Sequence, residues 1–246
     1  MLVDLALSPL DLGRFSDLSR WNIAVIDVLR ATSSMVSAAA AGCRRIVPVT
    51  GIEEARALAA EIASEQPVLA GERGGLKPEG FALGNSPAEF TPDSVGGRTV
   101  IMATTNGSRA FAKVAAGRRV LAVSFLNLTA SAEHLAREGQ DVLILCAGTD
   151  AAPGLEDVAC GGALAHRIRE LAGSSCLLAD AALIARNTFG AYPDVLAVLW
   201  RSSHGRFLES IGLGGDLEVC ARRDAAPLVL AMADGAIAPA GLPAKP

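Results

Sequence analysis

Short apolar runs, polar loops and Ala-rich stretches follow one another along the chain. Residues 23–29 form one apolar run that only Asp27 interrupts, and residues 34–41 form an Ala-rich stretch that stops at Gly42. A run of this length is typical of a strand buried on both faces of a mainly parallel sheet. Alanine is the best helix former, and glycine commonly follows the last residue of a helix. Residues 22–42 therefore predict a strand, a polar loop and a helix.

The same alternation continues through the rest of the chain. Further strands are predicted at residues 1–7 (as an edge strand), 45–50, 67–70, 98–104, 119–125, 141–147 and 216–221. Helices are predicted at residues 52–63, 109–116, 127–137, 155–172 and 175–187, and in part of 193–204. Thr50 and Glu53 have the spacing of a capping box before the first of these helices. The tail from Ala233, rich in Ala, Gly and Pro, is expected to be extended or loose. Alternating strands and helices indicate an α/β fold with a mainly parallel sheet.

Two stretches of the chain resemble one another at a spacing of 74 to 75 residues. Residues 25–49 and 100–123 both contain a strand, a polar loop, a helix, a glycine close to an Arg-Arg pair, and a second strand. Internal duplication is one interpretation. Coincidence between two ordinary α/β units is the other, because the match is short. We take residues 1–125 and 126–246 as two α/β halves, with the site in a cleft between the repeated strand–loop–helix units.

Composition narrows the class of protein and its partners. The chain has 246 residues, 51% of them hydrophobic, and a net charge of −4, which suits a large core and gives no basic patch for nucleic acid. Its five cysteines are odd in number and form no C-x-x-C pair, which argues against a disulfide scaffold and for a reducing interior. The N-terminus lacks a basic segment, and no apolar run reaches about 18 residues. We expect a soluble cytoplasmic protein without membrane or nucleic-acid partners, and leave open a homodimer.

The polar loop after the first strand is the first candidate site. It contains Asp27, Arg30, Thr32 and Ser33, between the end of a predicted strand and the start of a predicted helix. In α/β proteins, anions bind at such strand ends and helix N-termini. The alternative is that Asp27 is a buried structural acid paired with Arg30 and that Thr32 only caps the helix.

Three further loops carry polar residues after predicted strands. Glu72 and Arg73 follow residues 67–70 and could equally form a surface ion pair. The third candidate loop, residues 104–108, consists of Thr104, Thr105, Asn106, Gly107 and Ser108. Its N–H groups could form a cradle for phosphate, or the loop could be a plain Asn-Gly turn. Glu156 and Asp157 open a predicted helix, where they could hold Mg²⁺ or be stabilised by the helix dipole alone.

These loops share one chemistry. Arginine, backbone N–H groups and hydroxyls bind phosphoryl oxygens, and carboxylates bind a metal ion that neutralises them. The residue types alone therefore indicate a phosphate-handling α/β protein with Mg²⁺, and no further.

Six motifs in order resemble those of the 2-phosphosulfolactate phosphatase family. They span most of the chain and read DVLRAT (27–32), GER (71–73), GNSP (84–87), TTNGS (104–108), LED (155–157) and SHG (203–205). The resemblance implies a Mg²⁺-dependent acid phosphatase that hydrolyses 2-phosphosulfolactate to sulfolactate and phosphate in coenzyme M biosynthesis. It also implies a three-layer α/β/α fold made of two related halves. The chain departs from the family pattern at Ala82, where an acid is expected.

On this interpretation the site residues take the following roles. Some of Asp27, Glu72, Glu156 and Asp157 hold Mg²⁺, Arg30, Asn106 and Ser108 hold the phosphoryl oxygens, and Arg73 and Arg206 hold the sulfonate or carboxylate. His204 could protonate the leaving alkoxide, and Asp27 is nucleophile, base or ligand. The other substrate-binding candidates are Thr32, Ser33, Asn85, Ser86, Thr104, Thr105 and Gly107.

Two alternatives stay open at this point. A non-catalytic sensor of a phosphorylated or sulfonated metabolite would use the same arginines and hydroxyls, but acids without a metal would repel its ligand. An enzyme with the same chemistry could act on another small acidic phosphate ester.

Overall fold

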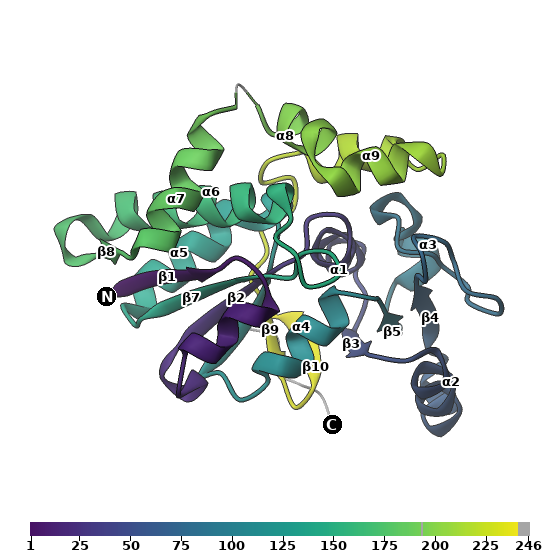
Figure 1. The fold of residues 1–246 in the computed structure, drawn as a ribbon. Coiled ribbons are helices and arrows are strands. Elements are labelled where there is room, and N and C mark those ends of the chain that lie inside the picture. The colour runs from purple at the N-terminus through teal and green to yellow at the C-terminus, as the bar shows by residue number, and fades with distance from the viewer. Residues whose placement is uncertain (193, 241–246) are drawn as a thin grey trace.

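A single mixed sheet forms the centre of the protein. The structure is a computed structural model, and it describes residues 1–192 and 194–240. Among these residues the strands lie in the order β4-β5-β3-β10-β9-β6-β2-β7-β1-β8 (Figure 1). Their bounds are β1 (Leu2–Ala6), β2 (Asn22–Ile26), β3 (Arg45–Val49), β4 (Val68–Gly71), β5 (Thr99–Ala103), β6 (Arg119–Val123), β7 (Val142–Cys146), β8 (Leu177–Leu178), β9 (Leu230–Ala233) and β10 (Ala236–Pro239).

The sheet has two parallel groups of strands joined by an antiparallel hairpin. Strands β4, β5 and β3 form one group, and β6, β2, β7, β1 and β8 form the other. The β9–β10 hairpin lies between them and pairs antiparallel with β6 on one side and β3 on the other. The expected α/β class and mainly parallel sheet are confirmed. The halves 1–125 and 126–246 share this sheet, since β7 lies between β2 and β1, and the duplication stays a prediction.

Helices pack on both faces of the sheet. The α-helices are α1 (Ala31–Ala40), α2 (Ile52–Glu61), α3 (Pro92–Val95), α4 (Gly107–Val114), α5 (Leu128–Glu138), α6 (Leu155–Ala172), α7 (Asp180–Gly190), α8 (Val195–Arg201), α9 (Ser203–Ser210) and α10 (Gly215–Cys220). Alternate residues of β2 enter different cores, because successive strand side chains point to opposite faces. Ile23 and Val25 pack in the core that includes α1 and α4, whereas Ala24 and Ile26 pack in the core beneath α5 and α6.

Several element predictions were wrong, each for a local physical reason. The predicted strand at residues 216–221 is helix α10, because Leu217 and Cys220 recur at helical spacing and both enter the core. The predicted helix at 175–187 begins only at Asp180, since residues 177–178 pair with β1 as strand β8. That pairing also makes β1 an internal strand rather than an edge.

The tail from Ala233, expected to be extended or loose, is extended as far as Pro239, where it completes the β9–β10 hairpin. Leu230 and Ile237 are fully buried, and Asp234 and Gly235 connect the strands with positive φ values of 50° and 75°. An Asp-Gly pair is a strong hairpin signal, which the Ala- and Pro-rich composition obscured. Residues 241–246 and Pro193 lie outside the described residues.

Two smaller expectations concern caps and cysteines. The cap of α2 uses Glu54 and not Glu53, because its carboxylate accepts hydrogen bonds from the N–H groups of Thr50 and Gly51 at 3.0 and 3.3 Å. All five cysteines are free and buried. Within the part of the chain that the structure describes, no helix is long and apolar enough to cross a bilayer.

Candidate active site

A cavity of about 290 Å³ opens where loops after β2, β4, β5 and β7 meet helix α9. The sequence-predicted residues that line it are Asp27, Arg30, Glu72, Asn85, Thr104, Thr105, Asn106 and His204. The other lining residues are Leu29, Gly74, Gly75, Thr149, Asp150, Ser203 and Phe207. The cavity therefore brings together loops from both parallel groups of the sheet.

Asp27 stands at the junction of β2 and α1 and is 6% exposed. Its Oδ1 accepts a hydrogen bond from the N–H of Ala31 at 3.1 Å, so the first turn of α1 holds the carboxylate. The hydroxyl of Thr32 bonds the backbone of Asp27, accepting from its N–H at 3.0 Å and donating to its C=O at 2.8 Å. Thr32 therefore fixes the loop at Asp27, but it does not cap α1, whose N-cap is Arg30 without a side-chain hydrogen bond.

Burial and neighbouring acids change the protonation of Asp27. Burial is the largest cause that raises its pKa, to about 7, and the charges of Glu72 and Glu156 raise the pKa further. The Ala31 N–H and the Arg30 guanidinium oppose this rise. A carboxylic acid poised near neutrality in a cleft is typical of a functional group, although structural networks also shift pKa values.

Helix α4 approaches Asp27 closely because its first residue is Gly107. A Cβ at that position would lie 2.8 Å from Asp27 Oδ2 and 2.5 Å from the Cβ of Ala31. Both contacts are too short for real atoms, so the N-termini of α1 and α4 can meet here only with a glycine. The positive ends of two helix dipoles consequently lie beside one carboxylate, where they favour negative charge.

Glu72 and Asp157 each tie two loops together through both carboxylate oxygens. Glu72 accepts hydrogen bonds from the N–H groups of Thr105 (2.7 Å) and Gly75 (3.0 Å). Asp157 accepts them from Val28 (2.8 Å) and Gly148 (2.9 Å). Burial is the main cause that raises the pKa of Asp157 well above its ordinary value, and the charges of Glu156 and Asp27 add to it. These two acids therefore fix the loops that carry the site.

One carboxylate oxygen of Asp27 and one of Glu156 lack a hydrogen-bond partner among the described residues. Glu156 Oε2 is buried without a hydrogen bond, and Asp27 Oδ2 accepts none. No set of three or more His, Cys, Asp or Glu side chains in residues 1–192 and 194–240 is arranged to hold a metal ion. Mg²⁺ is usually held by only one or two carboxylates plus water and substrate phosphate. The donors present fit a Mg²⁺ ion of that kind, and the ion itself stays a proposal.

The partner of Arg30 is Asp216, not Asp27. Arg30 Nη1 donates to Asp216 Oδ2 at 2.7 Å, and Nη2 donates to the C=O of Gly75 at 2.6 Å. Both side chains are almost completely buried. The Asp27–Arg30 pair, which belonged to the structural alternative for this loop, was therefore wrong. Sequence reasoning missed Asp216, since it lies 186 residues from Arg30 and no local motif marks it.

Most of the predicted hydroxyls bond the protein itself. Ser33 Oγ donates to the C=O of Val28 at 2.8 Å. Thr104 and Ser108 cap one another at the start of α4, where the Ser108 N–H donates to Thr104 Oγ1 at 3.0 Å and the Thr104 N–H donates to Ser108 Oγ at 3.1 Å. Ser86 Oγ donates to Asp216 Oδ1. These residues hold the walls of the cavity in place.

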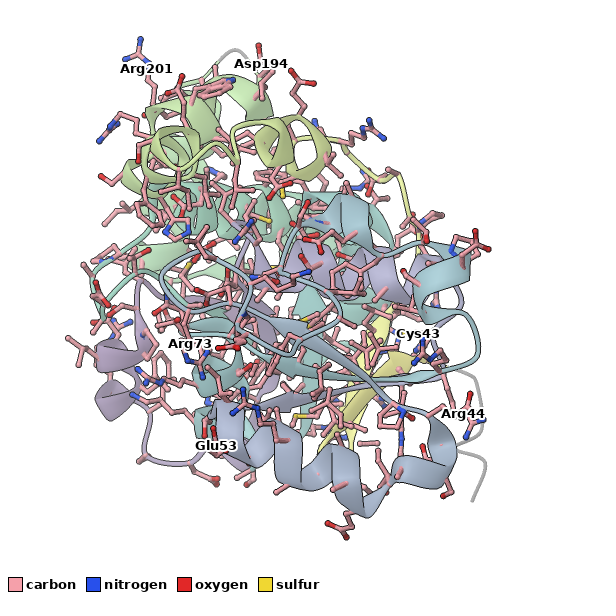
Figure 2. All side chains as sticks on the ribbon, turned by 90° about the vertical axis from the view of Figure 1, so that its right-hand side faces the viewer. Cys43, Arg44, Glu53, Arg73, Asp194 and Arg201 are labelled. Carbon is pink, nitrogen blue, oxygen red and sulfur yellow. The ribbon has the colours of Figure 1, made fainter. Side chains whose placement is uncertain are left out.

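Arg73 and Arg206 do not line the cavity. Arg73, labelled in Figure 2, donates to the C=O groups of Glu72 and Thr50 at 2.7 and 2.8 Å. Arg206 donates to the C=O of Arg201, which Figure 2 labels at the top of the molecule, and to Ser203 Oγ. Their expected contact with a sulfonate or carboxylate stays a prediction without support from this arrangement.

His204 lines the cavity from the first turn of α9. Its Nδ1 is 3.3 Å from Thr149 Oγ1, and its ring is 5.6 Å from that of Phe207. Burial is the main cause that lowers its pKa, and the charge of Arg30 lowers the pKa further. Thr149, Asp150 and Phe207 were missed because an ordinary loop and a helix carry them without any motif.

Comparison with known proteins identifies the family. A profile described as 2-phosphosulpholactate phosphatase matches residues 12–235. A protein of Thermotoga maritima is 37% identical over 212 residues, 86% of this chain and 88% of the relative, and one of Clostridium acetobutylicum is 36% identical over 237 residues, 96% of this chain and 100% of the relative. A third, from Symbiobacterium thermophilum, is 41% identical over 201 residues, 80% of this chain and 85% of the relative. All three are named probable 2-phosphosulfolactate phosphatase. The residues of the cavity and this match over most of the chain lead to one conclusion, that the protein belongs to the 2-phosphosulfolactate phosphatase family.

Proposed function

We propose that the protein hydrolyses 2-phosphosulfolactate, or a closely related small acidic phosphate monoester, to the hydroxy acid and phosphate with the help of Mg²⁺. Family membership supports the reaction class. The observation that carries the assignment to this site is the Asp27 carboxylate, whose unpartnered Oδ2 lies beside the N-terminus of α4 in the cavity.

Arg30 and helix α4 are the groups that hold the phosphoryl oxygens. Arg30 has five N–H donors and uses two of them on Asp216 and Gly75, so donors remain for an anion. Hydrogen bonds from a guanidinium to phosphate are charge-assisted and stronger than neutral ones. Asn106, the N-cap of α4, also lines the cavity and adds the polar N-terminus of that helix.

The cavity is lined by more acidic than basic side chains, so an anionic substrate needs a cation beside it. Asp27, Glu72 and Asp150 line it, while Arg30, the one arginine among its described lining residues, is already paired with Asp216. An anionic ester would be repelled unless positive charge were added. Asp27 and Glu156, whose charge raises the pKa of Asp27, would hold Mg²⁺, which would supply charge stabilisation for the phosphoryl oxygens.

His204 is positioned to protonate the leaving alkoxide. It lines the same cavity as Asp27, and Thr149 contacts its Nδ1. Its lowered pKa keeps it protonated only under acidic conditions, which accords with an acid phosphatase. The arrangement supports Asp27 equally as nucleophile, as base for water or as a charge that orients the cation.

The test is phosphate release from a panel of phosphorylated hydroxy acids. We expect 2-phosphosulfolactate to give the highest kcat/KM, and turnover to need added Mg²⁺. If another small acidic phosphate ester gave a higher kcat/KM, the assigned substrate would change, whereas the assigned reaction, phosphate monoester hydrolysis, would stand. Stoichiometric binding of the panel without phosphate release would instead favour the sensor.

A further inference from the structure

A buried network beside the cavity joins three separate segments of the chain. Arg30 comes from the loop after β2, Ser86 from the loop before the 3-10 helix at Pro87–Glu89, and Asp216 from α10. Asp216 Oδ2 accepts from Arg30 at 2.7 Å, and its Oδ1 accepts from Ser86 Oγ. Arg30 and Asp216 are 3% and 6% exposed, so water does not compete for these bonds.

We infer that Asp216 is a positioning residue for phosphoryl transfer, acting through Arg30. This inference rests on the proposed role of Arg30 as a ligand of the phosphoryl oxygens. A guanidinium on a long side chain has many rotamers, and fixing it costs conformational entropy. Asp216 and the C=O of Gly75 hold two of its nitrogens from the protein side, so the remaining N–H donors are fixed before substrate arrives.

The second carboxylate oxygen of Asp216, Oδ1, also fixes the loop that carries Ser86. Ser86 follows Asn85, a lining residue that is 4% exposed and whose buried Oδ1 has no partner among the described residues. The C=O of Asn85 accepts from Ser34 Oγ at 2.7 Å, which attaches this loop to α1. One carboxylate therefore sets the relative positions of Arg30 and of the loop that carries Asn85.

The alternative is that Asp216 only attaches α10 to the rest of the protein. A buried ion pair often contributes little to net stability, whereas removing one partner leaves an uncompensated charge that destabilises the fold. Melting temperature alone cannot separate the two roles. Turnover and phosphate affinity can, because attachment of α10 does not require Arg30 to be in any particular orientation.

The experiment compares Asp216→Asn with Glu218→Gln, which removes an exposed carboxylate of the same helix. We expect Asp216→Asn to lower kcat and the affinity for inorganic phosphate by about ten- to a hundredfold, the scale of a misplaced group. Glu218→Gln should leave both unchanged. Ser86→Ala, which keeps the Arg30 pair, should have a smaller effect than Asp216→Asn.

A double-mutant cycle with Arg30→Ala tests whether Asp216 acts through Arg30. Once Arg30 is absent, Asp216→Asn should change kcat by no more than about twofold, because the group it positions is gone. The double variant should also fold at least as well as Arg30→Ala, since it no longer buries an unpaired charge. Added methylguanidinium should restore part of the activity of Arg30→Ala but not of the double variant.

The outcomes separate the inference from the function on which it rests. A wild-type protein that releases no phosphate from any ester would refute the proposed function. An active wild type together with an Asp216→Asn variant of lowered melting temperature but unchanged kcat and phosphate affinity would refute the positioning role. Equal effects of Asp216→Asn with and without Arg30 would do the same.

Discussion

Gly107 lies so close to Asp27 that no residue with a side chain could take its place without a shift of the structure. A Cβ on residue 107 would lie 2.8 Å from Asp27 Oδ2. The first residue of α4 therefore lies against a buried carboxylate in the loop of a different strand–loop–helix unit. This contact unites the two polar loops that the sequence predicted separately.

The contact predicts a large effect from the smallest substitution. Gly107→Ala should lower turnover by about a hundredfold, because α4 or Asp27 must move by a substantial part of an ångström. Gly13→Ala is the matched control, since a Cβ there would have no atom within 4 Å. Steady-state kinetics and melting temperature of both variants are the measurement. Unchanged turnover in Gly107→Ala would mean that the two helix N-termini do not act together.

The raised pKa of Asp27 predicts how stability depends on pH. In the folded protein Asp27 titrates near 7, above the ordinary value of 3.8, so the folded state binds its proton more tightly than the unfolded state does. Without a divalent cation, stability should therefore fall as pH rises from about 4 to about 7. Asp27→Asn removes the buried charge, so at pH 8 it should be more stable than wild type by up to a few kcal/mol.

Denaturant unfolding at pH 4.5 and pH 8 in the presence of a chelator checks this. Asp93→Asn, at an exposed position, controls for loss of charge alone. An Asp27→Asn variant that unfolds at both pH values would show that Asp27 is a structural acid.

The pKa shifts of Asp27 and His204 predict the pH profile of the reaction. Turnover on this account needs Asp27 charged and His204 protonated, yet burial raises the pKa of Asp27 to about 7 and lowers that of His204. Few molecules satisfy both conditions in the absence of a cation. A bound cation favours the charged carboxylate, so rising Mg²⁺ concentration should move the acidic limb of kcat/KM to lower pH. An acidic limb that stays fixed while Mg²⁺ is varied would contradict the placing of the cation beside Asp27.

Arg30 and Asn106 should share one phosphate, because they line one cavity from different units of the sheet. Arg30→Ala should weaken inhibition by inorganic phosphate more than Asn106→Ala does, since only Arg30 makes charge-assisted hydrogen bonds. The double variant should depart from additivity by roughly 0.5–3 kcal/mol. Strict additivity would mean that the loop at residues 104–108 is only a turn.

The sequence predicted the parts of the site that follow buried strands. Asp27, Glu72 and Asn106 each lie just after a short apolar run, and the carboxyl ends of strands in a sheet are where ligands bind. Local pattern was sufficient for them because a strand end and a helix start are both local features. The sequence predicted the metal ligands less precisely. Residue type alone cannot show that both carboxylate oxygens of Glu72 and of Asp157 accept hydrogen bonds from backbone N–H groups.

The remaining residues depend on contacts between distant segments. Asp216 was not recognised because its partner lies 186 residues away and its own segment resembled a strand. The β9–β10 hairpin joins the two parallel groups of strands, and its position follows from neither hydrophobic period nor composition. Phe207 reaches the cavity because α9 lies against it, whereas Thr149 lies in the loop after β7, which no motif marks.

The central claim is that Asp27 and a divalent cation together hydrolyse a phosphate monoester in this cavity. The most direct measurement is single-turnover phosphate release from 2-phosphosulfolactate by wild type and by Asp27→Asn, each with Mg²⁺ and after exhaustive chelation. We predict release by wild type with Mg²⁺, its loss on chelation and its recovery with Mg²⁺ or Mn²⁺, and at least about a hundredfold slower release by a folded Asp27→Asn. Full release after chelation, or by Asp27→Asn, would contradict the account.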